Sequence, residues 1–174
     1  LQILEMNGRP KKWLLKDPSH IGHIPEILSA YPNAKFINIH RNPIESVASF
    51  CSLTKNIRSA FSKNVNPDQI GDLILDFWQH SLNKGMLEKQ KLFPNQIADI
   101  SYTNFIKSPL DAIKDAYQKL ELDIDIRTEN KINEYINNQK LIEKEQHIYS
   151  LAEFGLSKEK VEHHFKNYMM NYEF

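Results

Sequence analysis

The segment Lys35–His40 is short and apolar, and Arg41-Asn42-Pro43 and a helical pattern follow it directly. No other feature constrains the fold of this chain as strongly. Asn42 is a good N-cap, Pro43 suits the first helical position, and Glu45 stands three residues after the cap, as in a capping box. The sequence therefore predicts a strand, a tight turn and a helix in immediate succession.

One face of this helix is apolar at the i, i+3, i+4, i+7 spacing of a buried stripe: Ile44, Val47, Ala48 and Cys51. Ser49 lies off the stripe, and roughly 10 Å of helix rise separates it from Asn42, a span that a long arginine side chain can largely cover. Arg41 stands at the positive end of the helix dipole, where an anion is stabilised. The pattern favours one anion bound by Arg41 and Ser49, and the alternative is an exposed arginine and an unconnected helical serine.

A second unit lies upstream, where Lys12–Leu15 has the composition of a buried strand and ends in Lys16-Asp17-Pro18-Ser19-His20. Pro25 fits only the first turn of the helix that follows, so we expect His20 in the connection between strand and helix. Lys16 and His20 would then stand at the carboxyl edge of a parallel sheet, where open α/β sheets bind ligands and where Arg41 also leaves its strand. The alternative is that both are ordinary surface residues.

The rest of the chain predicts helices around that sheet. A capped start at Asn66–Gln69 begins a long helix toward Lys91, and Ser108-Pro109 opens another. Gln96–Ser101 is expected to be a third strand, and Asp123–Lys144 a solvated helix with looser ends. This order predicts an α/β fold with a parallel sheet flanked by helices, in a single domain over residues 1–174.

Composition excludes several classes of function. The chain has 174 residues and a formal net charge of 0, which argues against a general binder of nucleic acids or membrane surfaces. Cys51 is its single cysteine, so no internal disulfide forms, and its helical stripe makes it a small core residue. No apolar run reaches the length of a membrane span, no cysteine or carboxylate spacing completes a metal site with the histidines, and cytoplasmic location is the default expectation. The chain also lacks the glycine-rich loops of ATP-dependent kinases and dinucleotide enzymes.

Four segments resemble the PAPS-dependent sulfotransferases, which transfer a sulfuryl group from 3′-phosphoadenosine 5′-phosphosulfate (PAPS) to an acceptor, usually a hydroxyl. Residues 13–20 look like the family's W-x-L-K-x-P-x-H segment, and residues 31–43 with Ser49 look like its 3′-phosphate-binding strand and helix. Residues 100–109 are similar to a strand end whose tyrosine, here Tyr102, lies near the adenine. Residues 147–156, with the helix to Tyr168, look like the tail of bacterial-type members.

The resemblance implies a P-loop-like sulfotransferase fold and a role for each matched residue. His20 would be the general base that takes the proton of the acceptor, and Lys16 would stabilise the bridging oxygen of the donor. Arg41 and Ser49 would bind the 3′-phosphate of PAPS, and Tyr102 would pack on the adenine. No metal is expected, and the acceptor would be a small molecule, a glycan or a lipid.

The family's 5′-phosphosulfate loop, a P-R-S-G-T-T-like turn, has no counterpart in this sequence. We therefore expect the fold to be incomplete at the amino terminus and residues 1–174 to be the carboxyl-terminal portion of a longer domain. The late R-K-G phosphate loop of the cytosolic branch is also absent. Two hypotheses follow: a PAPS-dependent sulfotransferase, or a truncated or decayed non-catalytic α/β domain that acts in binding.

Overall fold

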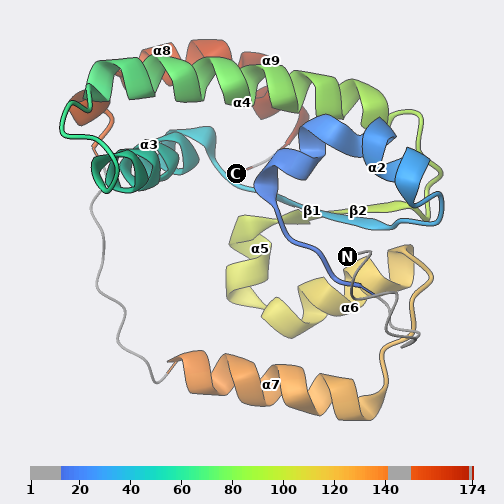
Figure 1. Ribbon diagram of the computed structural model, residues 1–174. Coiled ribbons are helices and arrows are strands. Elements are labelled where there is room, and N and C mark those ends of the chain that lie inside the picture. Colours follow the sequence, from blue (N-terminus) through green and yellow to red (C-terminus); the bar gives the residue numbers. More distant parts are fainter. Residues whose placement is uncertain (1–12, 141–149, 173) are drawn as a thin grey trace.

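A computed structural model describes residues 13–140, 150–172 and 174, and it arranges helices on both sides of a small parallel sheet (Figure 1). The sheet consists of strands β1 (Phe36–His40) and β2 (Ile97–Ser101). One side of it carries α2 (Ile24–Ala30), α4 (Pro67–Lys89) and α9 (Lys166–Asn171), and the other side carries α5 (Tyr102–Lys107) and α6 (Pro109–Lys119). Helix α7 (Ile126–Lys140) lies farther from the sheet, beyond α5 and α6. The α/β class with a parallel sheet is confirmed.

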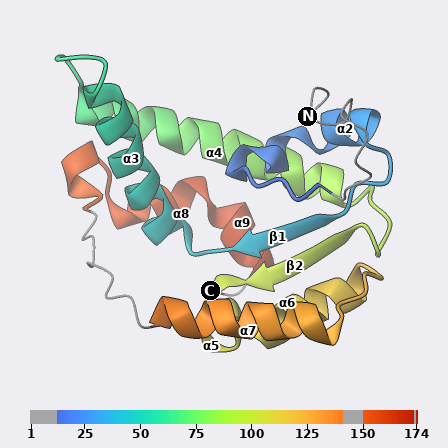
Figure 2. The ribbon, with the colours of Figure 1, turned by 60° about the horizontal axis from the view of Figure 1, so that its bottom comes forward.

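The two strands are β1 (Phe36–His40) and β2 (Ile97–Ser101), both predicted from their apolar sequences. They pair in parallel, and the register joins Phe36 to Ile97 at one end and His40 to Ser101 at the other. Figure 2 shows both arrowheads at the same end of the sheet, next to α9. Both strands therefore end at the same edge of the sheet, as expected for parallel strands.

The expected strand at Lys12–Leu15 is wrong for the residues that the structure describes. Residues 13–17 are irregular, Lys12 lies outside the described residues, and Leu14 is 89% exposed. An apolar run becomes a strand only when a neighbouring strand pairs with it, and no strand of the described residues does so here. The chain then forms the 3₁₀ helix η1 (Pro18–His23), capped by the Asp17 side chain on the Ser19 N–H, and α2 (Ile24–Ala30).

Helix α3 (Pro43–Ser59) starts where the sequence predicts, because the Asn42 side chain accepts a hydrogen bond from the Ile44 N–H at 3.0 Å. Val47, Ala48 and Cys51 are buried, as their stripe predicts. Burial raises the pKa of the Cys51 thiol to about 11, which fits an inert core residue. The predicted capping box does not form among these side chains, because the Asn42 side chain accepts from Ile44, one residue before Glu45, and the Glu45 carboxylate pairs with Arg41.

Helix α4 (Pro67–Lys89) is the long helix predicted from the Asn66 cap, and it contributes Ile70, Ile74 and Leu75 to the larger core. That core joins α3 and α4 to the tail elements η2 (Ala152–Phe154), α8 (Lys158–His164) and α9 (Lys166–Asn171). Gly71 permits the close approach, since a Cβ there would collide with the Phe154 carbonyl oxygen. Gly85 does the same for η1, because a Cβ there would lie 2.5 Å from Cγ1 of Ile21.

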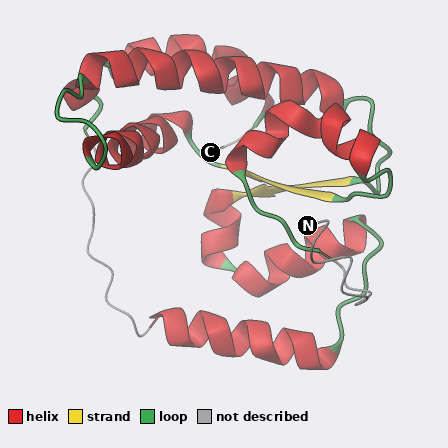
Figure 3. Ribbon diagram, in the orientation of Figure 1, coloured by secondary structure: helices red, strands yellow, loops and turns green. Residues whose placement is uncertain are grey.

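A second, smaller core packs β2 against α6 (Pro109–Lys119) through Ala98, Ile100, Ala116 and Leu120. The short helix α5 (Tyr102–Lys107) connects them and was not predicted. Helix α7 (Ile126–Lys140) falls within the predicted solvated helix Asp123–Lys144, of which residues 141–144 lie outside the described part. Ile37 and Ile39 on β1 stay 40% and 49% exposed, so the described elements leave part of this sheet face uncovered. Figure 3 shows how far helices outweigh strands in the described chain.

Candidate functional site

Arg41 and Tyr102 occupy equivalent positions at the carboxyl edge of the sheet. His40 and Ser101 form the last pair of the ladder. The residue that follows each strand, Arg41 after β1 and Tyr102 after β2, therefore leaves the sheet at the same level. The Arg41 guanidinium lies over the Tyr102 ring, with its Cζ 4.6 Å from the ring centroid. This cation–π contact directly joins two of the predicted site residues.

The Arg41 guanidinium also binds Glu45 one helical turn ahead. Its Nε and Nη2 donate to the same Glu45 oxygen, Oε2, at 3.2 and 3.1 Å. Both side chains are exposed, and Nη1 makes no hydrogen bond with the described residues. An anion could therefore approach Arg41 from solvent, but it would meet a neighbouring carboxylate.

Ser49 lies on the α3 helix that Arg41 precedes. It is half-buried, off the buried stripe as predicted, and its hydroxyl makes no hydrogen bond with the described residues. The hydroxyl is thus available to a ligand. Joint binding of one anion by Arg41 and Ser49 stays a prediction.

Lys16 and His20 come from the segment before and within η1. Lys16 is exposed and His20 is half-buried, and neither side chain forms a hydrogen bond with the described part of the chain. The two views of Figures 1 and 2 place the start of η1 near the end of the sheet where β1 stops. The segment therefore approaches the predicted edge, but as an irregular stretch and not as a strand end.

His40 forms the centre of a buried polar network that sequence reasoning missed. Its ring is 3% exposed, its Nδ1 lies 2.9 Å from the Tyr168 hydroxyl and its Nε2 lies 2.8 Å from Oδ1 of Asp99. The Tyr172 ring stacks on the imidazole, with the centroids 3.6 Å apart. Strand β1, strand β2 and the tail helix α9 therefore meet at one side chain.

Lys89 completes this network from the end of α4. Its Nζ donates to Asp99 Oδ2 at 2.5 Å and to the Tyr172 hydroxyl at 2.9 Å. Burial alone would raise the pKa of Asp99, but hydrogen bonds from His40 and Lys89 and the Lys89 charge outweigh it and lower the pKa to about 2. Asp99 is thus a carboxylate at neutral pH. Burial works against the charge of Lys89 too, yet its bonds to Asp99 and Tyr172 leave its pKa raised.

Two tyrosines one helical turn apart, at positions 168 and 172, were the available signal for this network. They mark one face of the tail helix, but nothing local to either tyrosine points to His40, which is 128 residues from Tyr168. His147 and Tyr149, which belong to the tail segment of the resemblance, lie outside the described residues.

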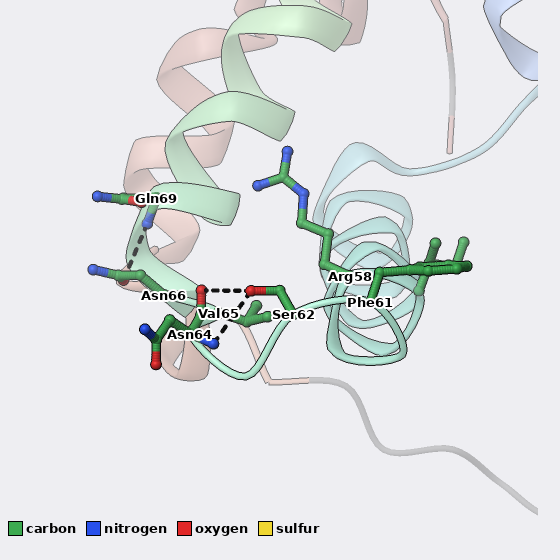
Figure 4. A pocket seen from close by; sticks show the side chains of 8 residues that line it. Arg58, Phe61, Ser62, Asn64, Val65, Asn66 and Gln69 are labelled. Carbon is green, nitrogen blue, oxygen red and sulfur yellow. Dashed lines mark hydrogen bonds between the residues drawn. The ribbon is translucent and has the colours of Figure 1, made fainter.

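The α3–α4 turn holds a shallow cavity of about 330 Å³. Its lining includes Ile57, Arg58, Phe61 and Gln69. Figure 4 labels Arg58, Phe61 and Gln69 around the turn. Ser62 Oγ closes the turn by accepting from the Asn64 N–H at 3.3 Å.

Within the described ranges, no group of three or more His, Cys, Asp or Glu side chains could hold a metal ion. No helix in this part of the protein is long and apolar enough to cross a bilayer.

Comparisons with known proteins agree on one family. A family model described as "Sulfotransferase family" matches residues 1–126. A search of curated protein sequences found no significant match.

Three solved structures resemble the protein. Sulfotransferase STF9 from Mycobacterium avium superposes with a TM-score of 0.83 at 22% identity, over 94% of this chain and 42% of that chain. Sulfotransferase STF1 from Mycobacterium tuberculosis H37Rv gives 0.75 at 28% identity, over 90% and 40%. The sulfotransferase domain from the curacin biosynthetic pathway gives 0.57 at 17% identity, over 99% and 66%. The chain thus spans about two fifths of the length of the two mycobacterial proteins.

Proposed function

Because the chain belongs to the sulfotransferase family, we propose that it supplies the 3′-phosphate-binding part of a site that transfers a sulfuryl group from PAPS to an acceptor hydroxyl. The observation that carries this proposal is the placement of Arg41. It leaves β1 at the carboxyl edge of a parallel sheet and immediately precedes the capped N-terminus of the 17-residue helix α3. That is the location at which α/β folds bind phosphate groups.

Arg41 and Ser49 would bind the 3′-phosphate together. A guanidinium gives charge-assisted hydrogen bonds to phosphate, and the free Ser49 hydroxyl adds a neutral one. Tyr102 already stacks on Arg41, so it would support the guanidinium from one side and offer its remaining surface to the adenine. These contacts would distinguish PAPS from nucleotides that lack a 3′-phosphate.

Sulfuryl transfer resembles phosphoryl transfer in its loose, in-line transition state, so catalysis is mostly positioning and charge stabilisation. His20 would take the proton of the acceptor hydroxyl, and Lys16 would stabilise the charge that develops on the bridging oxygen. Both roles require η1 and the segment before it to lie against the bound donor. The acceptor would be a small molecule, a glycan or a lipid.

Nucleotide selectivity tests this function directly. In a thermal-shift titration, we expect 3′,5′-ADP to stabilise the wild-type protein more than 5′-AMP does, because only the former carries a 3′-phosphate. Arg41→Ala should remove that preference, with a loss of about 10- to 100-fold in affinity for 3′,5′-ADP, the usual cost of a charge-assisted hydrogen bond.

Arg58→Ala is the matched control, because Arg58 is in the last turn of the same helix and lines the α3–α4 cavity. It should keep the wild-type preference. Equal stabilisation of the wild type by the two nucleotides would refute the 3′-phosphate site and favour the non-catalytic alternative.

A further inference from the structure

Arg41 lies outside the sheet ladder, so the paired strands do not fix its backbone. The ladder ends at His40 and Ser101, and the next helix begins with Asn42 as its cap. A phosphate-binding arginine in such a gap needs another contact to hold its direction. The tail helix α9 provides this contact.

Tyr168 of α9 holds the residue immediately before this gap. Its hydroxyl lies 2.9 Å from Nδ1 of His40, the residue before Arg41. Burial raises the pKa of this hydroxyl, and the backbone N–H of Arg41 opposes that effect from close by. One hydroxyl therefore fixes the last strand residue and lies beside the backbone of the arginine that follows it.

One assignment of donors and acceptors fits the contacts of His40 with Asp99 and Tyr168. The Asp99 carboxylate accepts a hydrogen bond from His40 Nε2, so in the neutral imidazole Nδ1 is the acceptor and Tyr168 donates to it. The Tyr168 oxygen is then free to accept a further hydrogen bond, on the side where the Arg41 backbone lies. Burial raises the pKa of Tyr168 above its ordinary value, so the hydroxyl keeps the proton that it donates.

Tyr172 and Lys89 hold the network in place. The Tyr172 ring covers the imidazole, and Lys89 Nζ joins the Tyr172 hydroxyl to Asp99. The tail helix is itself attached to the large core through Phe165, which is 2% exposed, and Val161, which is fully buried. The sheet edge and the helical core are thus coupled at His40.

We propose that Tyr168 is a positioning residue for the phosphate-binding arginine: through its hydroxyl, the carboxyl-terminal helix sets the direction in which Arg41 leaves the sheet. This inference rests on the proposed function for its consequence, selectivity for a 3′-phosphate. It does not rest on that function for its geometry. Tyr168 itself touches neither donor nor acceptor.

Tyr168→Phe tests the proposal because it removes the hydroxyl and leaves the ring. We expect the ratio of affinities for 3′,5′-ADP and 5′-AMP to fall about five- to ten-fold toward unity. Amide hydrogen exchange at Arg41 should become at least several-fold faster in the same variant. A purely structural role would lower the melting temperature without changing the ratio.

Val161→Ala is the matched control, because it opens a cavity in the same tail without touching the network. It should lower the melting temperature and preserve both the selectivity ratio and the exchange rate at Arg41. The proposal is overturned if Tyr168→Phe keeps the wild-type ratio, or if Val161→Ala changes the ratio and the exchange rate equally.

The two proposals fail in different ways. If the wild type does not prefer 3′,5′-ADP, the proposed function fails, and amide exchange at Arg41 still decides whether Tyr168 holds the backbone. If the wild type prefers 3′,5′-ADP and Tyr168→Phe retains the full preference, only the positioning role fails.

Discussion

Two chain segments bring cations toward the same edge of the sheet, and they are held very differently. Arg41 stands between a paired strand and a capped helix, its guanidinium lies over the Tyr102 ring, and the Tyr168 hydroxyl binds the residue before it. Lys16 and His20 lie on an irregular stretch and a short 3₁₀ helix, and their side chains make no hydrogen bond with the described residues. The residue proposed to hold the nucleotide is therefore pre-positioned by its own fold, whereas the two residues proposed to act in the chemistry depend on what binds beside them.

The largest difference between the two segments should appear in stability. His40→Ala removes the centre of a buried network and takes the His40 partner from the Tyr168 hydroxyl and from Asp99 Oδ1, so we expect a loss of about 2–4 kcal/mol in the free energy of unfolding. His20→Ala should cost less than about 1 kcal/mol, since it breaks no hydrogen bond between described side chains.

Urea unfolding followed by circular dichroism measures both variants on one scale. Equal losses of unfolding free energy for the two histidine variants would show that the segment around Arg41 is held no more firmly than the segment around His20.

Acid should weaken the sheet-edge network through Asp99. Because the folded-state pKa of Asp99 is lowered from 3.8 to about 2, its carboxylate stabilises the fold above pH 4, and this stability is lost as the pH falls from about 4 to about 2. The shift corresponds to about 2 kcal/mol. Asp99→Asn should therefore be less stable at pH 6 and should show a flatter pH dependence in that window.

Unfolding free energies measured at half-unit pH steps between 6 and 2.5 test this expectation. Identical slopes below pH 4 in the wild type and Asp99→Asn would show that the network does not favour the charged carboxylate.

A smaller effect should come from the Glu45 carboxylate beside Arg41. Glu45→Gln removes a negative charge that an incoming phosphate would meet, so we expect affinity for 3′,5′-ADP to rise about two- to five-fold, less so at high salt. Stability should change by less than about 1 kcal/mol, because the Arg41–Glu45 pair is exposed.

Glu162→Gln serves as the control, since Glu162 forms a comparable exposed i,i+4 pair with Lys158 on α8. Isothermal titration calorimetry would compare the two variants. A drop in affinity for Glu45→Gln would mean that Glu45 orients Arg41 for the ligand and does not compete with it.

Local signals in the sequence correctly predicted the elements around Arg41, the start of α4 and strand β2. The Asn42 and Asn66 caps, the apolar stripe through Cys51 and the strand at Gln96–Ser101 all depend on residues within one or two turns of each other. Such patterns can be recognised because the residues that determine them lie close together in the sequence.

What the sequence did not predict depends on distant partners. The apolar run at Lys12–Leu15 looked like a strand, but pairing decides strand formation, and among the described residues nothing pairs with it. Helix α5 follows β2 with no side-chain hydrogen bond capping its N-terminus, so the sequence offers no capping signal for it. The His40–Tyr168 contact joins residues 128 positions apart, which no local pattern encodes.

Phosphorus NMR of bound 3′,5′-ADP tests the central claim most directly, because the 3′- and 5′-phosphates give separate resonances. On addition of the wild-type protein, we expect the 3′-phosphate resonance to shift and broaden, and Arg41→Ala to abolish this change while Arg58→Ala retains it. A 3′-phosphate resonance that stays at its free position, or that responds equally to the Arg41→Ala variant, would contradict a phosphate site at the end of β1.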